Sequence, residues 1–130
     1  MRATLLTALA GIAIAFAASA EQPVGVWKTT PKDDGRYLHI EIAPCTDGAQ
    51  LLCGTTVGAF AGARTDIVGK RIFWDMAPDG AGKWTGGEIW APDEDKTYSG
   101  MLEMNGATLE ISGCVMGGLI CRGQDWTRAH

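Results

Sequence analysis

The sequence lacks the short motifs by which most enzymes and nucleotide-binding proteins are identified. It contains no Gly-x-Ser-x-Gly nucleophile motif and no glycine-rich phosphate loop that leads into a helix. Its two histidines are His39 and His130, and one strand histidine with distant carboxylates does not provide the converging ligands of a metal site. We therefore expect a protein that is not an enzyme and has no catalytic residues, metal or cofactor.

A cluster of basic residues is also missing. The chain has 15 acidic and 11 basic residues, which give a formal net charge of −4 at pH 7. Nucleic acids and anionic membrane surfaces are bound mainly through basic patches, so this composition argues against both as partners. Small molecules and other proteins remain as possible partners, and the composition leaves the oligomeric state open.

No apolar run is long enough to span a bilayer. The apolar stretch 5–18 is shorter than the roughly 20 residues that a membrane-spanning helix needs. It follows the basic Arg2 and ends at Ala18-Ser19-Ala20, whose small residues are typical of a signal peptidase cleavage site. We predict a signal peptide over residues 1–20 and one domain over residues 21–130. That domain is then periplasmic or secreted and not an integral membrane protein.

Four cysteines lie downstream of this segment. In an exported protein an even number of cysteines is typically oxidised to disulfides, and three pairings are possible for four. We favour Cys45 with Cys53 and Cys114 with Cys121 because each pair encloses a short segment, and the second encloses a Gly-Gly turn between two strand-like runs. There is no Cys-x-x-Cys pair, which argues against a redox or zinc-binding role.

Short runs of β-branched and aromatic residues alternate with turn sequences every eight to twelve residues or so, a pattern typical of all-β domains. Asn105-Gly106 has the composition of a tight hairpin turn. The longest predicted loop is the Gly- and Ala-rich segment 58–69, which is either a lid or a simple connection. We predict about eight strands, joined mostly as a meander, over residues 24–30, 36–43, 51–57, 70–75, 83–90, 97–104, 108–114 and 121–128.

Within these strands apolar and polar residues alternate. Leu38, Ile40 and Ile42 share one face of the second strand, and Leu109 and Ile111 share one face of the seventh. One apolar face per strand predicts a single interior, and closure of the sheet would remove its two exposed edges. The expected fold is therefore all-β, a small antiparallel up-and-down barrel of about eight strands. Its interior is either filled by side chains or open to one small ligand.

The two ends of the predicted barrel carry a further pattern. Gly25-Val26-Trp27 lies on the first strand and Trp126-Thr127-Arg128 on the last. This arrangement resembles the lipocalin superfamily, in which a Gly-x-Trp of the first strand packs beneath an arginine of the final strand. A guanidinium over an indole face gains about 0.5 to 2 kcal/mol of cation–π attraction. The resemblance implies that Gly25, Trp27, Trp126 and Arg128 close the barrel, and that Trp27 and Arg128 have a structural and not a ligand-binding role.

A broader resemblance covers nearly all of residues 21–130. The chain is similar to a bacterial exported family of lipocalin-like proteins catalogued as domain of unknown function 2147. One position differs, because the family commonly has an aromatic residue followed by Asp-Pro where this chain has Trp90-Ala91-Pro92. A family site that used this Asp would be altered here. The resemblance implies a fold and a compartment but no reaction. It rests on residues 25–27, 66–69, 84–90 with Pro92, 96–98, Leu109 with Gly113, and 124–128.

Four aromatic side chains are candidate ligand-binding residues. Indole and phenol rings offer apolar area and one hydrogen-bonding group each, which suits a pocket for an apolar or amphipathic molecule. The alternative is that they fill the core of a small barrel. The candidates are Trp74, Trp84, Trp90 and Tyr98, of which Trp90 and Tyr98 lie beside the Pro92 loop.

The polar candidates favour structural roles. His39 alternates with apolar neighbours, so we expect it on the outside of its strand and not as a ligand. The acidic run 93–95 fills a turn and lacks the alternating ligands of a calcium loop. Asp75 and Glu88 would act as an acid–base pair only if their strands bring them together inside a cavity.

These observations favour an exported, non-catalytic protein that binds or carries a small apolar or amphipathic ligand in its barrel. A structural or protein-interaction module of the cell envelope with a filled barrel is the main alternative. An envelope enzyme is the third hypothesis, and it would need polar groups that converge inside the barrel.

Overall fold

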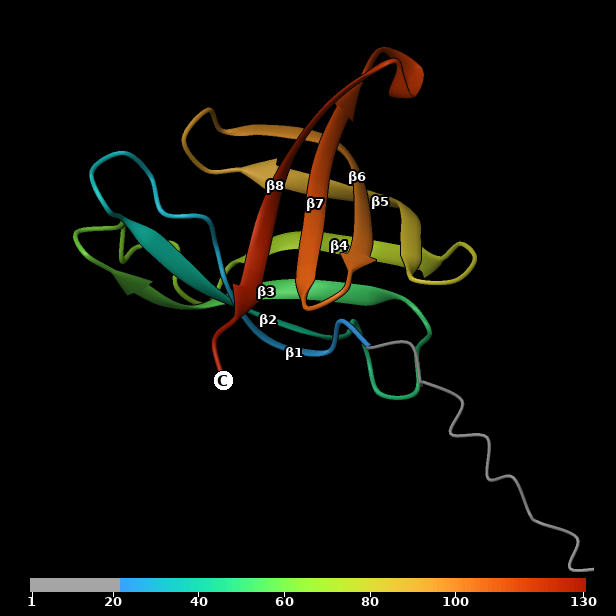
Figure 1. Cartoon of the computed structure of the whole chain (residues 1–130), viewed down its shortest axis with the longest axis horizontal. Coiled ribbons are helices and arrows are strands. Elements are labelled where there is room, and N and C mark those ends of the chain that lie inside the picture. The colour runs from blue at the N-terminus through green and yellow to red at the C-terminus, as the bar shows by residue number, and fades with distance from the viewer. Residues whose placement is uncertain (1–21) are drawn as a thin grey trace, which may run out of the picture.

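A computed structural model describes residues 22–130, and the predicted signal peptide lies outside the described residues. Every strand pairs antiparallel with the next along the chain, and the last pairs with the first to close a barrel (Figure 1). This confirms the predicted all-β up-and-down barrel. Among residues 22–130 no helix is long and apolar enough to cross a membrane. The elements are β1 (Gly25–Lys28), β2 (Tyr37–Pro44), β3 (Leu52–Phe60), β4 (Arg71–Pro78), β5 (Lys83–Ala91), β6 (Lys96–Asn105), β7 (Thr108–Val115), the 3-10 helix η1 (Met116–Gly118) and β8 (Ile120–Arg128).

The largest differences from the predicted strand boundaries are at the ends of β3 and β4, which both continue three residues further than predicted. The sequence predicts a loop from Gly58, whereas β3 continues to Phe60, which pairs with Tyr37 of β2. Position 58 of this strand requires glycine because the Phe60 ring packs against its backbone. A Cβ at Gly58 would lie 2.8 Å from Phe60 Cε2. The connection that remains, residues 61–70, consists mainly of turns.

The first and last strands meet over a short seam. They share two residue pairs, one of which joins Trp27 and Arg128. The Arg128 Cζ lies 4.2 Å from the centre of the Trp27 ring. Its guanidinium donates hydrogen bonds to the carbonyl oxygens of Val24 at 2.7 Å and Gln22 at 2.5 Å. The Trp27 indole N–H donates to the carbonyl oxygen of Pro23 at 2.7 Å. A single arginine therefore ties the end of β8 to the segment before and within β1.

Gly25 leaves room for this arginine. Its φ is +135°, a backbone conformation that glycine adopts far more readily than other residues. A Cβ at this position would lie 2.7 Å from the Arg128 guanidinium nitrogen NH1. A side chain at position 25 would therefore push the guanidinium away from the Trp27 ring.

The inward faces of the strands form one apolar core. Two glycines admit large neighbours into it: a Cβ at Gly54 would lie 2.3 Å from Phe73 Cε1, and a Cβ at Gly100 would lie 2.2 Å from Met76 Cε. Part of the barrel is therefore closely packed, with backbone in direct contact with side chains. The buried core residues are Trp27, Ile40, Ile42, Leu52, Ile72, Phe73, Met76, Trp84, Leu102, Leu109, Ile111 and Trp126.

The two cysteine pairs favoured from the sequence are the two that are bonded in the structure. Cys45 is joined to Cys53 and Cys114 to Cys121, with Cα–Cα distances of 4.8 and 4.1 Å. Cys114 and Cys121 are direct partners across β7 and β8, so their disulfide staples this hairpin close to its turn. Two such bonds are typical of a protein that folds in an oxidising compartment.

Candidate functional site

The barrel contains an open cavity of about 660 Å³. Small-molecule sites usually have volumes of about 300–1,000 Å³. Side chains therefore do not fill the whole interior, and of the two interiors that the sequence allows, the structure has the open one. The space available is sufficient for one small ligand.

The inner part of the cavity, which we call the apolar floor, is formed by Ile40, Ile72, Ile89, Ile111 and Trp126. These residues come from five different strands, and each side chain is buried or half-buried. All five also belong to the core or pack against it. The only hydrogen-bond donor among their side chains, the Trp126 indole N–H, is already bound to the Gln124 Oε1 at 2.7 Å. The floor therefore offers apolar contact and no free polar group.

Charged side chains surround the opening of the cavity, and most are bound to one another. Lys32 forms an ion pair with Asp93. Arg64 donates two hydrogen bonds to the Asp66 carboxylate, at 3.0 and 2.7 Å, which lower the pKa of Asp66. Arg64 also donates to the carbonyl oxygen of Pro92 at 3.2 Å. These contacts hold the 61–70 loop against the turn between β5 and β6.

Two arginines at the opening, Arg36 and Arg122, differ in their partners. Arg122 has no carboxylate within ion-pair distance in the part of the chain that the structure describes. Arg36 instead forms an ion pair with Asp34, whose carboxylate oxygen lies 2.6 Å from the buried Arg36 Nε. Arg122 is therefore the arginine of the mouth whose charge has no protein partner among the described residues.

Two of the four aromatic candidates, Trp90 and Tyr98, line the cavity. The acidic turn between β5 and β6 holds both rings. The Tyr98 hydroxyl donates to Glu94, a hydrogen bond that raises the pKa of Tyr98. The Trp90 indole N–H donates to Asp95 at 2.9 Å. The acidic run 93–95 is thus an exposed turn whose carboxylates position side chains of the cavity mouth.

The other two candidates lie elsewhere. Trp84 is buried in the core opposite Leu102 of β6. Trp74 is half-buried and pairs with Glu88 of β5, while its neighbour Phe73 occupies the inward position of β4. Neither indole is part of the cavity lining, and the geometry gives no reason to keep Trp74 and Trp84 among the ligand-binding candidates.

Trp126, which the sequence assigns to barrel closure, also contributes to the cavity floor. Its ring centre lies 6.5 Å from that of Phe73 in the core. The residues that sequence reasoning missed are the arginines of the mouth, Arg36 and Arg122. They are far apart in the chain and share no local motif, so only the closed barrel brings them to one opening.

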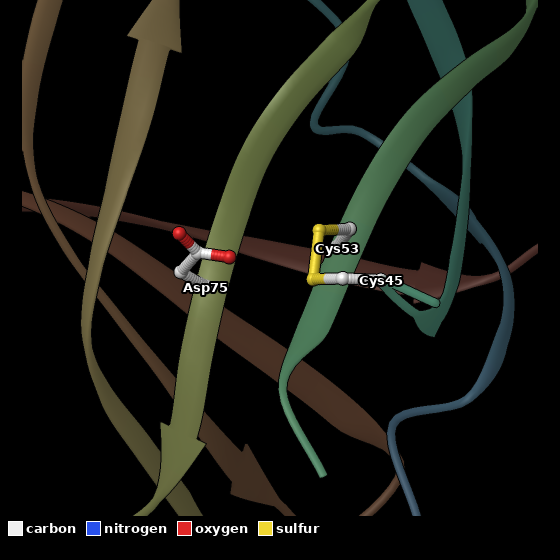
Figure 2. Close-up of side chains that lie close together, drawn as sticks. All are labelled: Cys45, Cys53 and Asp75. Atoms are coloured by element: carbon white, nitrogen blue, oxygen red, sulfur yellow. A yellow bond between two sulfur atoms is a disulfide. The ribbon is translucent and has the colours of Figure 1, made fainter. Parts of the chain in front are cut away.

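The carboxylates Asp75 and Glu88 do not form a catalytic pair in the cavity, because both are exposed and neither lines it. Asp75 instead lies beside the disulfide between Cys45 and Cys53 (Figure 2). The ligand atoms of these three residues lie within 4.8 Å of one another. Because the two sulfur atoms are bonded to each other, no thiolate is available to a metal. In the oxidised protein the Asp75 carboxylate is therefore the one possible metal ligand of this group.

His39 is not a cavity residue. Its ring belongs to an aromatic cluster with Tyr37, Phe60 and His130, with centre-to-centre distances to His39 of 5.8, 4.4 and 5.8 Å. Partial burial, followed by the charges of His130 and Lys28, lowers the pKa of His39. These contacts give His39 a packing role.

Comparisons with known proteins agree with this architecture. Residues 25–128 match the family described as "Uncharacterized protein conserved in bacteria (DUF2147)". A solved structure, that of protein HP1028 from Helicobacter pylori, is described as belonging to the lipocalin family. The two chains share 14% sequence identity with a TM-score of 0.66, and the alignment covers 84% of each. No curated protein matches this chain. At this identity the similarity shows the lipocalin-like fold alone.

Proposed function

Because the chain belongs to the uncharacterized bacterial family DUF2147, its function must be inferred from its own cavity, and we propose that it binds a small amphipathic ligand without altering it. One observation supports this proposal above all others. The open cavity of about 660 Å³ has an apolar floor and a charged mouth. A ligand with an apolar tail and a polar head matches both parts.

The tail would lie on the apolar floor. Removing apolar surface from water contributes roughly 25 cal/mol per Å², and no unsatisfied polar side chain of the floor opposes it. The floor residues are already fixed by the core, so little side-chain freedom is lost when a ligand binds. Most of the affinity would come from this contact.

The head would be anionic. Arg122 lines the mouth and pairs with no carboxylate of the described residues, while Arg36, also at the mouth, is paired with Asp34. Hydrogen bonds between a guanidinium and a carboxylate or phosphate are among the stronger polar contacts. The acidic residues of the mouth, Asp93 and Glu94, are bound to Lys32 and Tyr98 and would repel the head less than free carboxylates.

The lining favours binding over catalysis. Among the described residues that line the cavity there is no histidine, cysteine or serine. The Ser–His and Cys–His pairs of many hydrolases are therefore missing from it, and its carboxylates Asp93 and Glu94 are bound to Lys32 and Tyr98. The two disulfides support placing this binding protein in the periplasm or outside the cell, where the predicted signal peptide would deliver it.

Filling the floor should prevent binding. We expect Ile111→Phe to weaken binding of dansyl-undecanoic acid by about ten-fold or more, because the added ring occupies the space of the tail. Val57→Phe is the matched control, since Val57 is exposed on β3 outside the lining. Fluorescence titration measures both affinities, and thermal melting verifies that both variants fold. If the unaltered protein binds no amphiphile, the barrel is not a carrier and the structural-module alternative gains support.

Removing the unpaired cation should affect only charged ligands. We expect Arg122→Ala to weaken dodecanoate binding by about ten-fold, since a hydrogen bond to a charged group contributes roughly 1.5–3 kcal/mol. Binding of dodecanol, which has the same tail, should change little. Lys96→Ala, an exposed lysine outside the lining, is the control. Competition with the dansyl probe provides the measurement, and equal losses for acid and alcohol would contradict an anionic head.

A further inference from the structure

The turn of the β7–β8 hairpin carries a cluster of exposed aliphatic side chains. Val115, Met116, Leu119 and Ile120 have exposed fractions of 39%, 70%, 84% and 54%. We call these four residues the apolar tip. Exposed clusters of this kind usually mark a surface that contacts something else.

The apolar tip projects away from the rest of the barrel (Figure 1). The last residue of β7 that pairs with β6 is Cys114, so Val115 pairs only with Ile120. On the other side, β1 reaches β8 only near Arg128. Beyond the Cys114–Cys121 disulfide the hairpin is therefore a narrow two-stranded ribbon that pairs with no other strand among residues 22–130. The disulfide holds the two strands together at the base of this ribbon.

The charge of the ribbon also separates it from the rest of the molecule. Residues 115–121 include no charged side chain, in a chain with 26 charged residues. The first charge beyond it is the unpaired cation Arg122. An apolar tip with one cation at its base matches the order of layers in a phospholipid bilayer, where acyl chains lie beneath phosphates.

The apolar tip is continuous with the cavity. Val115, Ile120 and Arg122 all line the cavity mouth. Whatever the tip inserts into would therefore lie next to the entrance of the site. An amphipathic molecule leaving a bilayer at this point could enter the barrel without crossing open water.

We propose that the apolar tip inserts into a phospholipid surface and directs the cavity mouth toward it. A protein partner fits less well, because a stable protein interface buries roughly 800 Å² on each partner, more than four side chains on a narrow ribbon provide. A bilayer, by contrast, deforms around a small protruding tip. Docking depends on the tip alone, whereas the delivery of a ligand through it rests on the proposed function.

Flotation with phosphatidylcholine vesicles tests the docking. We expect the wild-type protein to float with the vesicles, and the double variant Met116→Ser, Leu119→Ser to bind about ten-fold more weakly or worse. The matched control is Val24→Ser, Val57→Ser, which removes two residues of similar type that are 46% and 45% exposed outside the tip. This control should float as the wild type does.

Three results would overturn the inference: a wild-type protein that does not float, a tip variant that floats equally well, or a control that loses binding to the same extent. Tip-dependent self-association in analytical ultracentrifugation without flotation would also overturn it, in favour of a protein partner. Because both tip residues are exposed, circular dichroism and melting temperature should stay unchanged in the double variant.

A second readout separates docking from ligand binding. The tip variant should bind dansyl-undecanoic acid in solution as tightly as the wild type does, but should take it up from vesicles about ten-fold more slowly. If the wild type floats and binds no amphiphile, the proposed function fails while docking stands. If it binds the amphiphile and does not float, docking fails while the proposed function stands.

Discussion

Substitution of Gly87 by alanine is expected to destabilise the barrel by roughly 3 kcal/mol or more, a large part of the stability of a small domain. A Cβ at Gly87 would lie 2.2 Å from the Trp74 carbonyl oxygen, 2.8 Å from the Asp75 carbonyl carbon and 2.9 Å from the Met76 amide nitrogen. All three atoms belong to the backbone of β4, so no flexible side chain can move aside. The whole strand would have to shift.

Asp75 shows why β4 approaches so closely. Its φ is +57°, a left-handed conformation that is uncommon for residues other than glycine. This local departure from extended geometry lies between two regular pairs with β5, Trp74 with Glu88 and Ala77 with Thr85. A residue without a side chain is needed opposite the distortion, and Gly87 provides it.

Urea denaturation followed by tryptophan fluorescence would measure the loss. Gly113→Ala is the matched control, because the atoms nearest to a Cβ at Gly113 belong to the Tyr98 side chain and lie at ordinary distances of 3.4 Å or more. We expect this control to change the free energy of unfolding by less than about 1 kcal/mol. Near-equal unfolding midpoints for the two variants would mean that β4 is more adaptable than its geometry indicates.

Truncation of Trp27 is expected to have an effect of similar size. Trp27→Ala should lower the free energy of unfolding by about 3–5 kcal/mol, the usual result of replacing a fully buried large aromatic residue. Trp27 is 0% exposed. The substitution would also leave the Arg128 guanidinium without its ring and the Pro23 carbonyl oxygen without the indole donor.

Two variants separate these contributions. Trp74→Ala removes an indole of the same size from a half-buried position and should cost clearly less than Trp27→Ala. Arg128→Met keeps the length of the side chain and removes the charge. It should lower the free energy of unfolding by about 2–4 kcal/mol, because the cation–π contact and two hydrogen bonds are lost. If Trp74→Ala costs as much as Trp27→Ala, the seam contributes nothing beyond ordinary burial.

The sequence was sufficient for the fold because the responsible signals are local. Alternation assigns Ile40, Ile42, Leu109 and Ile111 to the interior, where all four are buried. The hairpin at Asn105-Gly106 forms as expected, with Asn105 paired to Thr108 and Gly106 at a φ of +61°. Short segments between paired cysteines were enough to select the disulfides.

The site was less predictable because its parts come from distant segments. The ion pair between Lys32 and Asp93 joins residues on opposite halves of the chain. Strict alternation also failed at β2, where Tyr37 and Leu38 both line the cavity. In the pairing of β2 with β3 the register shifts between His39 and Ile40, and the unpaired residue is Val57 of β3, so the two-residue period on which face assignments depend is interrupted in β3.

The closure of the barrel has a consequence for how the chain acquires its fold. Seven of the eight strand pairings join neighbours in sequence, while the pairing of Trp27 with Arg128 spans nearly the whole domain. Hairpins form early because they close short loops, and distant contacts form late. A transient open sheet, with β1 and β8 as free edges, would therefore precede the native state. Newly made molecules are most prone to aggregate through strand-to-strand association in that interval, until the final residues of β8 arrive.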